Sequence, residues 1–134
     1  RSAAVVYRSP EDGAWFVRRQ TQKPTPVDER PEPGRFVRIA PEELRAAVRF
    51  RDALAARGAK LVLAYVPTRE HNAIQRDAAR ELARLLGVPL VAPVVEGLGT
   101  RDGDHLSDES QARFGRAFVG ALEALPEVRD ARGT

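Results

Sequence analysis

The stretch KLVLAYVPTREHNAIQRDAARELARLLGVPLVAPV, residues 60–94, decides the expected fold. It starts with an apolar run at 60–66 that ends at Pro67, which is typical of a strand buried on both faces of a parallel sheet. Residues 88–94 form a second run, whose prolines indicate an edge or strand-end position. Between the runs, apolar residues recur at helical spacing up to Gly87: Ile74, Ala78, Leu82, Leu85 and Leu86. This order predicts a βαβ unit with parallel strands and a right-handed crossover.

Two further helices are expected, one before this unit and one after it. The first begins at Pro41, a residue suited to the first helical position, and ends at Gly58. Its first turn carries Glu42 and Glu43, where negative charge is favourable. The last helix ends at Pro126 and carries one apolar stripe: Phe114, Ala117, Phe118, Ala121, Leu122 and Leu125. The sequence therefore predicts an α/β fold with a short, mainly parallel sheet flanked by helices.

The chain divides into three parts. Residues 1–38 are irregular, with apolar runs at 3–7 and 14–17 that indicate a hairpin around a turn. Four prolines then interrupt a charged segment that ends at Gly34: Pro24, Pro26, Pro31 and Pro33. This segment is predicted to be an extended surface loop, either a lid or a linker. Residues 39–126 form the α/β domain portion, and residues 127–134 are predicted to be a frayed tail.

The composition supports one domain or a large piece of one. The chain has 134 residues, of which 43% are hydrophobic, and it has no cysteine for a disulfide, a thiolate nucleophile or a metal cluster. Its 22 Lys and Arg and 19 Asp and Glu residues are spread without a basic block, so nucleic-acid binding is not indicated. No apolar run approaches the ~20 residues of a membrane-spanning helix, and no cofactor is expected. The start at Arg1 leads us to expect a processed form, an excised domain or a cut fragment.

A polar loop after the second strand contains one of the two histidines, His105. The loop leaves the carboxyl end of a predicted parallel strand, where open α/β sheets place their sites. Asp102 lies three residues before His105, so its carboxylate can hold one imidazole nitrogen and leave the other free to accept a proton. We therefore assign Asp102 as the orienting acid and His105 as the general base. The alternative is a solvated acidic loop leading into a helix cap, in which His105 only packs locally.

The loop offers no convincing nucleophile. Ser107 is better explained as the N-cap of the last helix, and Ser110 lies on its first turn. Ser2 and Ser9 lie in the N-terminal region without the glycine-rich turn of a strained nucleophile.

A metal site at this loop is not expected. Its ligands would be Asp102, Asp104, His105 and Asp108. The pattern fails the EF-hand test, because Leu106 occupies the third ligand position and no glycine follows where one is required.

A second polar cluster follows the first predicted strand, at residues 67–72. We expect Thr68, Arg69 and Asn72 of this cluster to bind substrate, with Arg69 supplying positive charge to a bound ester or sugar. Asn72 is the only asparagine of the chain, and its simpler interpretation is a capping residue in a strand-to-helix turn.

Three stretches carry a family resemblance: the strand at 61–67, the turn Leu-Gly-Val-Pro-Leu-Val at 86–91, and the block Asp-Gly-Asp-His-Leu-Ser-Asp-Glu-Ser at 102–110 followed by Phe114. Over roughly residues 41–125 the chain resembles the C-terminal half of SGNH/GDSL-type hydrolases and related bacterial O-acyltransferase domains. The resemblance implies a flavodoxin-like, three-layer fold, of which this chain holds a part. It also implies that an Asp-x-x-His block before the last helix supplies the catalytic acid and base, here Asp102 and His105.

The chain departs from this family at the nucleophile. The family's Gly-Asp-Ser block, and the glycine and Gly-x-Asn-Asp block that build its oxyanion hole, are not found in the sequence. Asn72 follows the strand and cannot be matched to them. Either an N-terminal segment or a second chain supplies the serine, or the chain is a degenerate member that kept the fold and lost the reaction.

The resemblance implies an ester hydrolase or an O-acetyl or acyl transferase that acts on a small ester or a carbohydrate O-acyl group. It also implies a periplasmic, secreted or cell-envelope location. The alternative function is a non-catalytic carbohydrate- or protein-binding module on the same fold.

Overall fold

The βαβ unit predicted from residues 60–94 is present in the computed structural model, which describes residues 5–8, 15–18, 24–28, 37–70 and 72–132. Strand β4 (Leu63–Ala64) pairs in parallel with β5 (Leu90–Val91), and helix α2 (Asn72–Leu86) connects them. Gly87 follows this helix with a φ of 64°, a left-handed conformation that glycine adopts without strain. The helix therefore ends where the sequence predicts.

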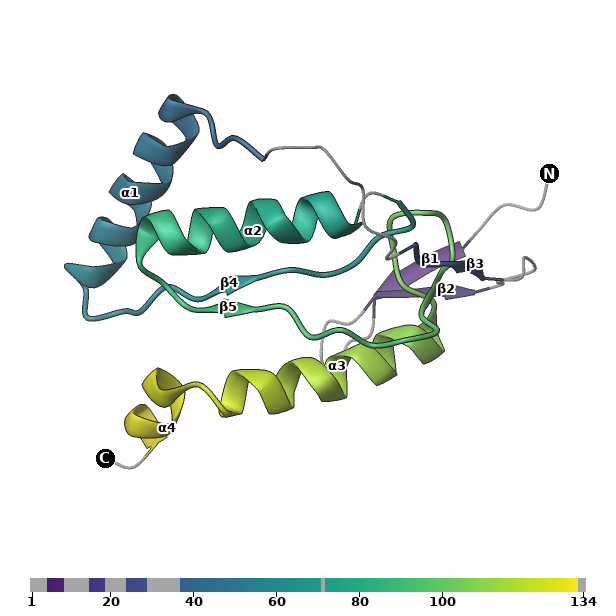
Figure 1. Ribbon diagram of the computed structural model, residues 1–134. Coiled ribbons are helices and arrows are strands. Elements are labelled where there is room, and N and C mark those ends of the chain that lie inside the picture. Colours follow the sequence, from purple (N-terminus) through teal and green to yellow (C-terminus); the bar gives the residue numbers. More distant parts are fainter. Residues whose placement is uncertain (1–4, 9–14, 19–23, 29–36, 71, 133–134) are drawn as a thin grey trace.

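Helices cover the strand pair from two sides. Figure 1 shows α2 and α3 (Asp108–Glu123) on opposite sides of β4 and β5. Helix α1 (Pro41–Ala55) packs against α2, and its predicted start at Pro41 is confirmed. Together with α4 (Pro126–Arg132), the described residues contain four helices, and the fold is mixed α/β.

The strands are shorter and more open than the apolar runs predict. The β4–β5 ladder spans two residues in each strand, and backbone bonds from Leu63 to Pro89 and from Tyr65 to Val91 extend it only slightly. Prolines at the ends of both runs limit the pairing because they cannot donate to a ladder. The expected burial on both faces is wrong: Tyr65 is 8% exposed, whereas Val66 is 52% exposed. Helix α3 contacts β5 and leaves this face of β4 open.

The described strands are not mainly parallel. Of the three described strand pairs, only β4–β5 is parallel. Strands β1 (Val5–Arg8) and β2 (Trp15–Arg18) form an antiparallel pair, and each overlaps one of the two N-terminal apolar runs. The short connection between them allows only an antiparallel pairing, since a parallel one needs a long crossover.

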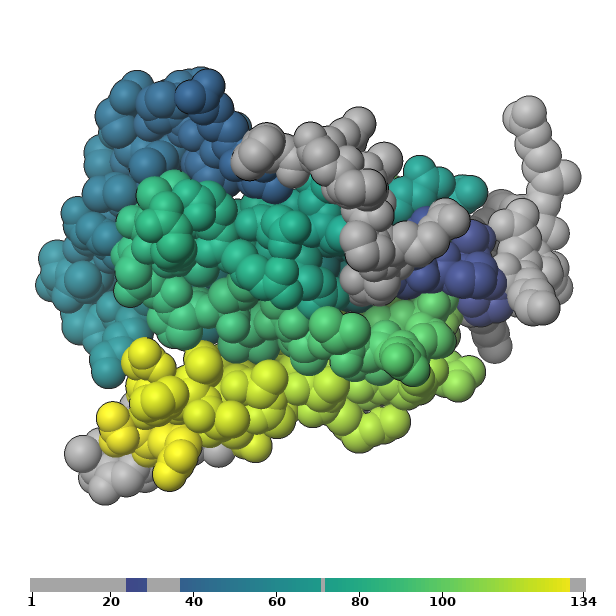
Figure 2. All heavy atoms as spheres, in the orientation of Figure 1, coloured from purple at the N-terminus to yellow at the C-terminus, as the bar shows by residue number. Residues whose placement is uncertain are grey.

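Part of the proline-rich segment is bound to the rest of the fold. Strand β3 (Thr25–Pro26) pairs antiparallel with β6 (Gly99–Thr100), and Val27 N–H donates to Leu98 O at 3.0 Å. Figure 2 shows this dark blue segment against the green atoms of the β6 region. A lid or linker does not describe residues 24–28, which form a strand next to the polar loop. Residues 29–34 of the predicted loop lie outside the described residues.

The C-terminal residues form a helix in place of the predicted frayed tail. Helix α3 ends at Glu123, and α4 begins at Pro126 and continues to Arg132. Proline is favourable at the first position of a helix because its missing N–H would have no intrahelical partner there. Glu127 adds a negative charge to the same turn. Pro126 therefore starts a helix rather than only ending the previous one.

A small apolar cluster lies directly under the polar loop. Leu98, Leu106 and Phe114 are at most 7% exposed, and Val27 and Phe118 pack against them. The cluster joins the strand before the loop, the loop's end and helix α3, so it fixes where the loop begins and ends. No helix among the described residues has the length and apolar character needed to cross a membrane.

Candidate active site

The loop between β6 and α3 folds back on itself. The N–H of Arg101 donates to the carbonyl of His105 at 2.9 Å, and the N–H of Ser107 donates to the carbonyl of Gly99 at 2.8 Å. Gly103 lies at the tip with a φ of 98°, a conformation that side-chain-bearing residues rarely adopt. These bonds give residues 102–105 one defined turn.

The tip of the loop is also bound from outside. The N–H of Arg69 donates to the carbonyl of Gly103 at 2.8 Å, and the N–H of Asp28 donates to the carbonyl of Arg69 at 2.9 Å. Three segments that are distant in the sequence therefore meet at this point. The two polar clusters predicted from the sequence lie side by side.

Asp102 and His105 form the contact that their spacing predicts. Nδ1 of His105 lies 2.7 Å from Oδ2 of Asp102, and the other carboxylate oxygen accepts the backbone N–H groups of His105 at 2.7 Å and Asp104 at 3.1 Å. An ionised carboxylate only accepts hydrogen bonds, so Nδ1 carries the proton in this pair. Nε2 is then the nitrogen that can accept a proton. The catalytic roles of the two residues stay predictions.

The hydrogen bonds also affect the carboxyl group itself. The pKa of Asp102 lies below its usual value of 3.8, chiefly because the backbone N–H of His105 donates to it. The imidazole bond and the Asp104 N–H lower this pKa further, and slight burial opposes them. Asp102 is therefore ionised at neutral pH. The pair is open to solvent: the side chains of His105 and Asp102 are 72% and 48% exposed.

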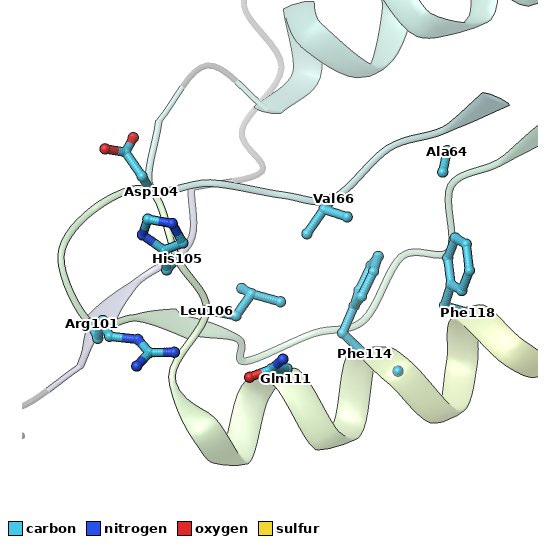
Figure 3. Close-up of a pocket in the computed structure, with 10 residues that line it drawn as sticks. Ala64, Val66, Arg101, Asp104, His105, Leu106, Gln111, Phe114 and Phe118 are labelled. Carbon is cyan, nitrogen blue, oxygen red and sulfur yellow. The ribbon is translucent and has the colours of Figure 1, made fainter. Parts of the chain in front are cut away.

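A groove runs from His105 along helix α3. Its volume is about 380 Å³, and Figure 3 shows the residues that line it. The polar end holds His105, Arg101 and Gln111, whereas the other end is apolar. The apolar lining comes from the open face of β4, the end of the loop and α3: Ala64, Val66, Leu106, Phe114 and Phe118.

A second, polar hollow lies on the other side of the loop tip. It has a volume of about 280 Å³ and is lined by Thr68, Arg69, Gln75 and Gly103, among others. Asp104 lines both cavities. Two of the three predicted substrate-binding residues, Thr68 and Arg69, thus lie beside the Asp102–His105 loop.

Asn72, the third predicted substrate-binding residue, is buried at 0% exposure. Its amide nitrogen donates to the carbonyls of Asp28 at 2.8 Å and Thr68 at 2.7 Å. Its amide oxygen accepts the Thr68 N–H at 2.8 Å and the Tyr65 hydroxyl at 2.5 Å. All donors and acceptors of this amide are used within the protein. Asn72 thus has a structural role in the strand-to-helix turn, but its amide bonds residues that precede α2 and not the first N–H groups of the helix, as an N-cap would.

The two described serines near the loop are engaged in the start of α3. Ser107 is the N-cap, as predicted, and its hydroxyl oxygen accepts the Ser110 N–H at 3.4 Å. The Ser110 hydroxyl oxygen accepts the Gly99 N–H at 2.9 Å, and Ser107 Oγ donates to it at 2.9 Å. Both residues are 5% exposed. Ser2 and Ser9 lie outside the described residues.

Sequence reasoning missed the groove residues Arg101, Gln111 and Val66. Arg101 directly precedes Asp102, the expected orienting acid, and this placement of a positive charge is the signal that could have identified it. Val66 was assigned to a buried strand face, so its exposure was not foreseen. Within the described part of the chain, no group of three or more acidic or histidine side chains is arranged to hold a metal ion.

Comparisons with protein-family models, with curated proteins and with solved structures found no match to this chain. The family resemblance therefore rests on the residues quoted from the sequence.

Replacing Asn72 with alanine should lower the free energy of unfolding by about 3 kcal/mol, because partly buried backbone groups of Thr68 and Asp28 lose a partner. Tyr65→Phe removes one of the four bonds and should cost about 1 kcal/mol. Urea denaturation of both variants measures the two values. If the alanine variant lost less stability than Tyr65→Phe, Asn72 would not be the residue that holds this turn.

Protonation of Asp102 should release the loop. Because its folded pKa is depressed, its bonds contribute stability above the usual pKa of 3.8 and lose it as the pH falls through the lower folded value. The amide protons of Asp104 and His105 should therefore shift together in an NMR titration, with a midpoint below 3.8. Asp102→Asn should abolish this transition and Asp104→Asn should keep it. A midpoint above 3.8 would disagree with the geometry.

Proposed function

We propose that the chain supplies the general base and orienting acid of an ester hydrolase or O-acyl transferase that resembles the SGNH/GDSL type. The observation that carries the proposal is the 2.7 Å contact between Nδ1 of His105 and Oδ2 of Asp102, at the polar end of an apolar groove. An acid that holds one imidazole nitrogen leaves the other as the base.

In the proposed reaction, His105 works with a serine from an N-terminal segment or a second chain. Nε2 of His105 removes the proton from the serine hydroxyl as its oxygen bonds to the ester carbonyl carbon. The resulting imidazolium returns this proton to the departing alcohol oxygen as the ester C–O bond breaks. Asp102 stays ionised throughout and stabilises the imidazolium.

The second half of the reaction repeats these transfers. Water or a sugar hydroxyl gives its proton to Nε2 and attacks the acyl-serine. The proton then passes to the serine oxygen when the acyl group leaves. Hydrogen-bond donors that stabilise the negatively charged carbonyl oxygen are also required.

The two cavities support this proposal because each suits a different part of an ester. The groove beside His105 suits an apolar acyl group, and the hollow with Thr68 and Arg69 suits a polar alcohol or sugar. Asp104 lies between them and has no assigned catalytic role.

A non-catalytic binding module is the second candidate. Two observations favour it: the His105 side chain is 72% exposed, and neither described serine is free to attack a substrate. In this case the groove and hollow would hold a carbohydrate or protein group without reaction. Esterase activity of the full-length protein separates the two functions.

His105→Ala should lower the hydrolysis of a p-nitrophenyl ester by the full-length protein by about 10³-fold or more, because no other group would accept the serine proton. Glu109→Ala is the control, since this exposed residue of α3 lies outside both cavities and should change the rate less than about threefold. Initial rates at saturating and low ester concentration measure kcat and kcat/KM. Unchanged turnover in the His105 variant would refute the proposal.

A further inference from the structure

We propose that the groove binds the apolar chain of a medium-length carboxylic acid, with its carboxyl end against Arg101. The substrate of the proposed reaction would then be a medium-chain acyl ester rather than an acetyl ester. The ester part of this inference rests on the proposed function, whereas binding of the free carboxylate does not.

Arg101 gives the groove a positive end. Its side chain is 17% exposed, and its Nε is buried without a hydrogen-bond partner among the described residues. The nearest carboxylate oxygen, on Asp108, lies 3.7 Å from the guanidinium, which is too far for a hydrogen bond. Arginine is rarely buried without a paired acceptor. The guanidinium is therefore suited to a ligand carboxylate, which it can bind through two N–H groups.

The other charged groups near Arg101 leave this role open. Asp108 is 72% exposed and solvated, so it neutralises Arg101 only weakly. Asp102 is engaged by His105 and two backbone N–H groups. Figure 3 shows the Asp104 carboxylate directed away from Arg101. A carboxylate ligand would thus give Arg101 the hydrogen-bonded acceptor that its 3.7 Å ion pair with Asp108 does not supply.

The rest of the groove fits an aliphatic chain. Beyond Arg101 and His105 its walls are Val66, Leu106 and Phe114, and Phe118 lies farthest from the polar end in Figure 3. The groove follows α3 from Gln111 to Phe118, which is about 10 Å at the rise of an α-helix. An acetyl group would fill only the polar end, whereas a chain of roughly eight carbons would reach Phe118.

Two glycines of α3 provide a matched pair of variants. Gly115 lines the groove, whereas Gly120 lies on the same helix outside it. A Cβ atom at either position would meet no atom within 4 Å, so both positions accept a side chain. Leucine is a better helix former than glycine, so both substitutions favour the helix equally. Only Gly115→Leu should fill the groove.

Binding of acetate, butanoate, octanoate and 1-octanol to the full-length protein tests the proposal by NMR titration or calorimetry. Each added methylene of the carboxylate should raise the affinity about fourfold until the chain reaches Phe118, from the transfer free energy of a methylene group. Gly115→Leu should weaken octanoate at least about tenfold, and Gly120→Leu should leave it unchanged. Arg101→Gln should weaken octanoate about tenfold and leave 1-octanol unchanged.

Several results would overturn the proposal. One is equal affinity for acetate and octanoate, and another is an equal effect of the two glycine variants on octanoate binding. A third is an Arg101→Gln variant that binds octanoate as tightly as the wild type does. A groove covered by another segment or by a second copy would bind none of the ligands, which also rejects it. These measurements need no turnover. Octanoate binding without esterase activity would reject only the proposed function, and activity limited to acetyl esters would reject only this inference.

Discussion

The buried amide of Asn72 is the interaction on which the candidate site depends. The amide bonds to both the backbone N–H and the backbone carbonyl of Thr68. It also accepts a hydrogen bond from the Tyr65 hydroxyl and donates one to the carbonyl of Asp28. Because the amide is fully buried, no water can replace a lost partner, so the turn after β4 has one stable arrangement. Arg69, the next residue in this turn, then bonds to Gly103 at the loop tip. A residue predicted to bind substrate thus determines where the loop lies.

The loop position in turn separates two environments. On one side, His105 faces an apolar groove, and on the other, Thr68 and Arg69 line a polar hollow. The loop can divide them because it is narrow: one turn, closed by the backbone bond between Arg101 and His105. In the proposed reaction, the acyl chain would occupy the groove and the alcohol or sugar the hollow. The scissile bond would then lie at the loop tip, within reach of the imidazole.

Local features of the sequence predicted helices α1, α2 and α3 and the Asp102–His105 contact, but not helix α4. A proline marks the start of α1 and a glycine marks the end of α2. A separation of three residues allows a carboxylate to reach an imidazole within one turn. These signals depend on residues that lie close together in the sequence, so they can be recognised in a single sequence. The catalytic role of the pair depends on groups outside the described residues and stays a prediction.

Features that arise from long-range contacts were not predicted. The pairing of β3 with β6 joins residues 75 positions apart, as Thr25 and Thr100 show, and no local pattern marks either strand. Val66 is exposed because α3 packs on β5. An apolar run in the sequence does not reveal where a helix packs. Pro126 was interpreted only as a stop, although proline is equally suited to begin a helix.

Exposure of His105 limits what the pair can do alone. A 72% exposed imidazole in water interacts weakly with charge that develops during a reaction, because solvent screens it. In the proposed reaction the pair would need a cover over the exposed imidazole that excludes water and leaves the groove open to the acyl chain. In the proposed reaction the acyl chain would lie on Val66 and Phe114, and the chain that supplies the serine would close over His105. In the proposed reaction, the nucleophile would approach the imidazole from its exposed side.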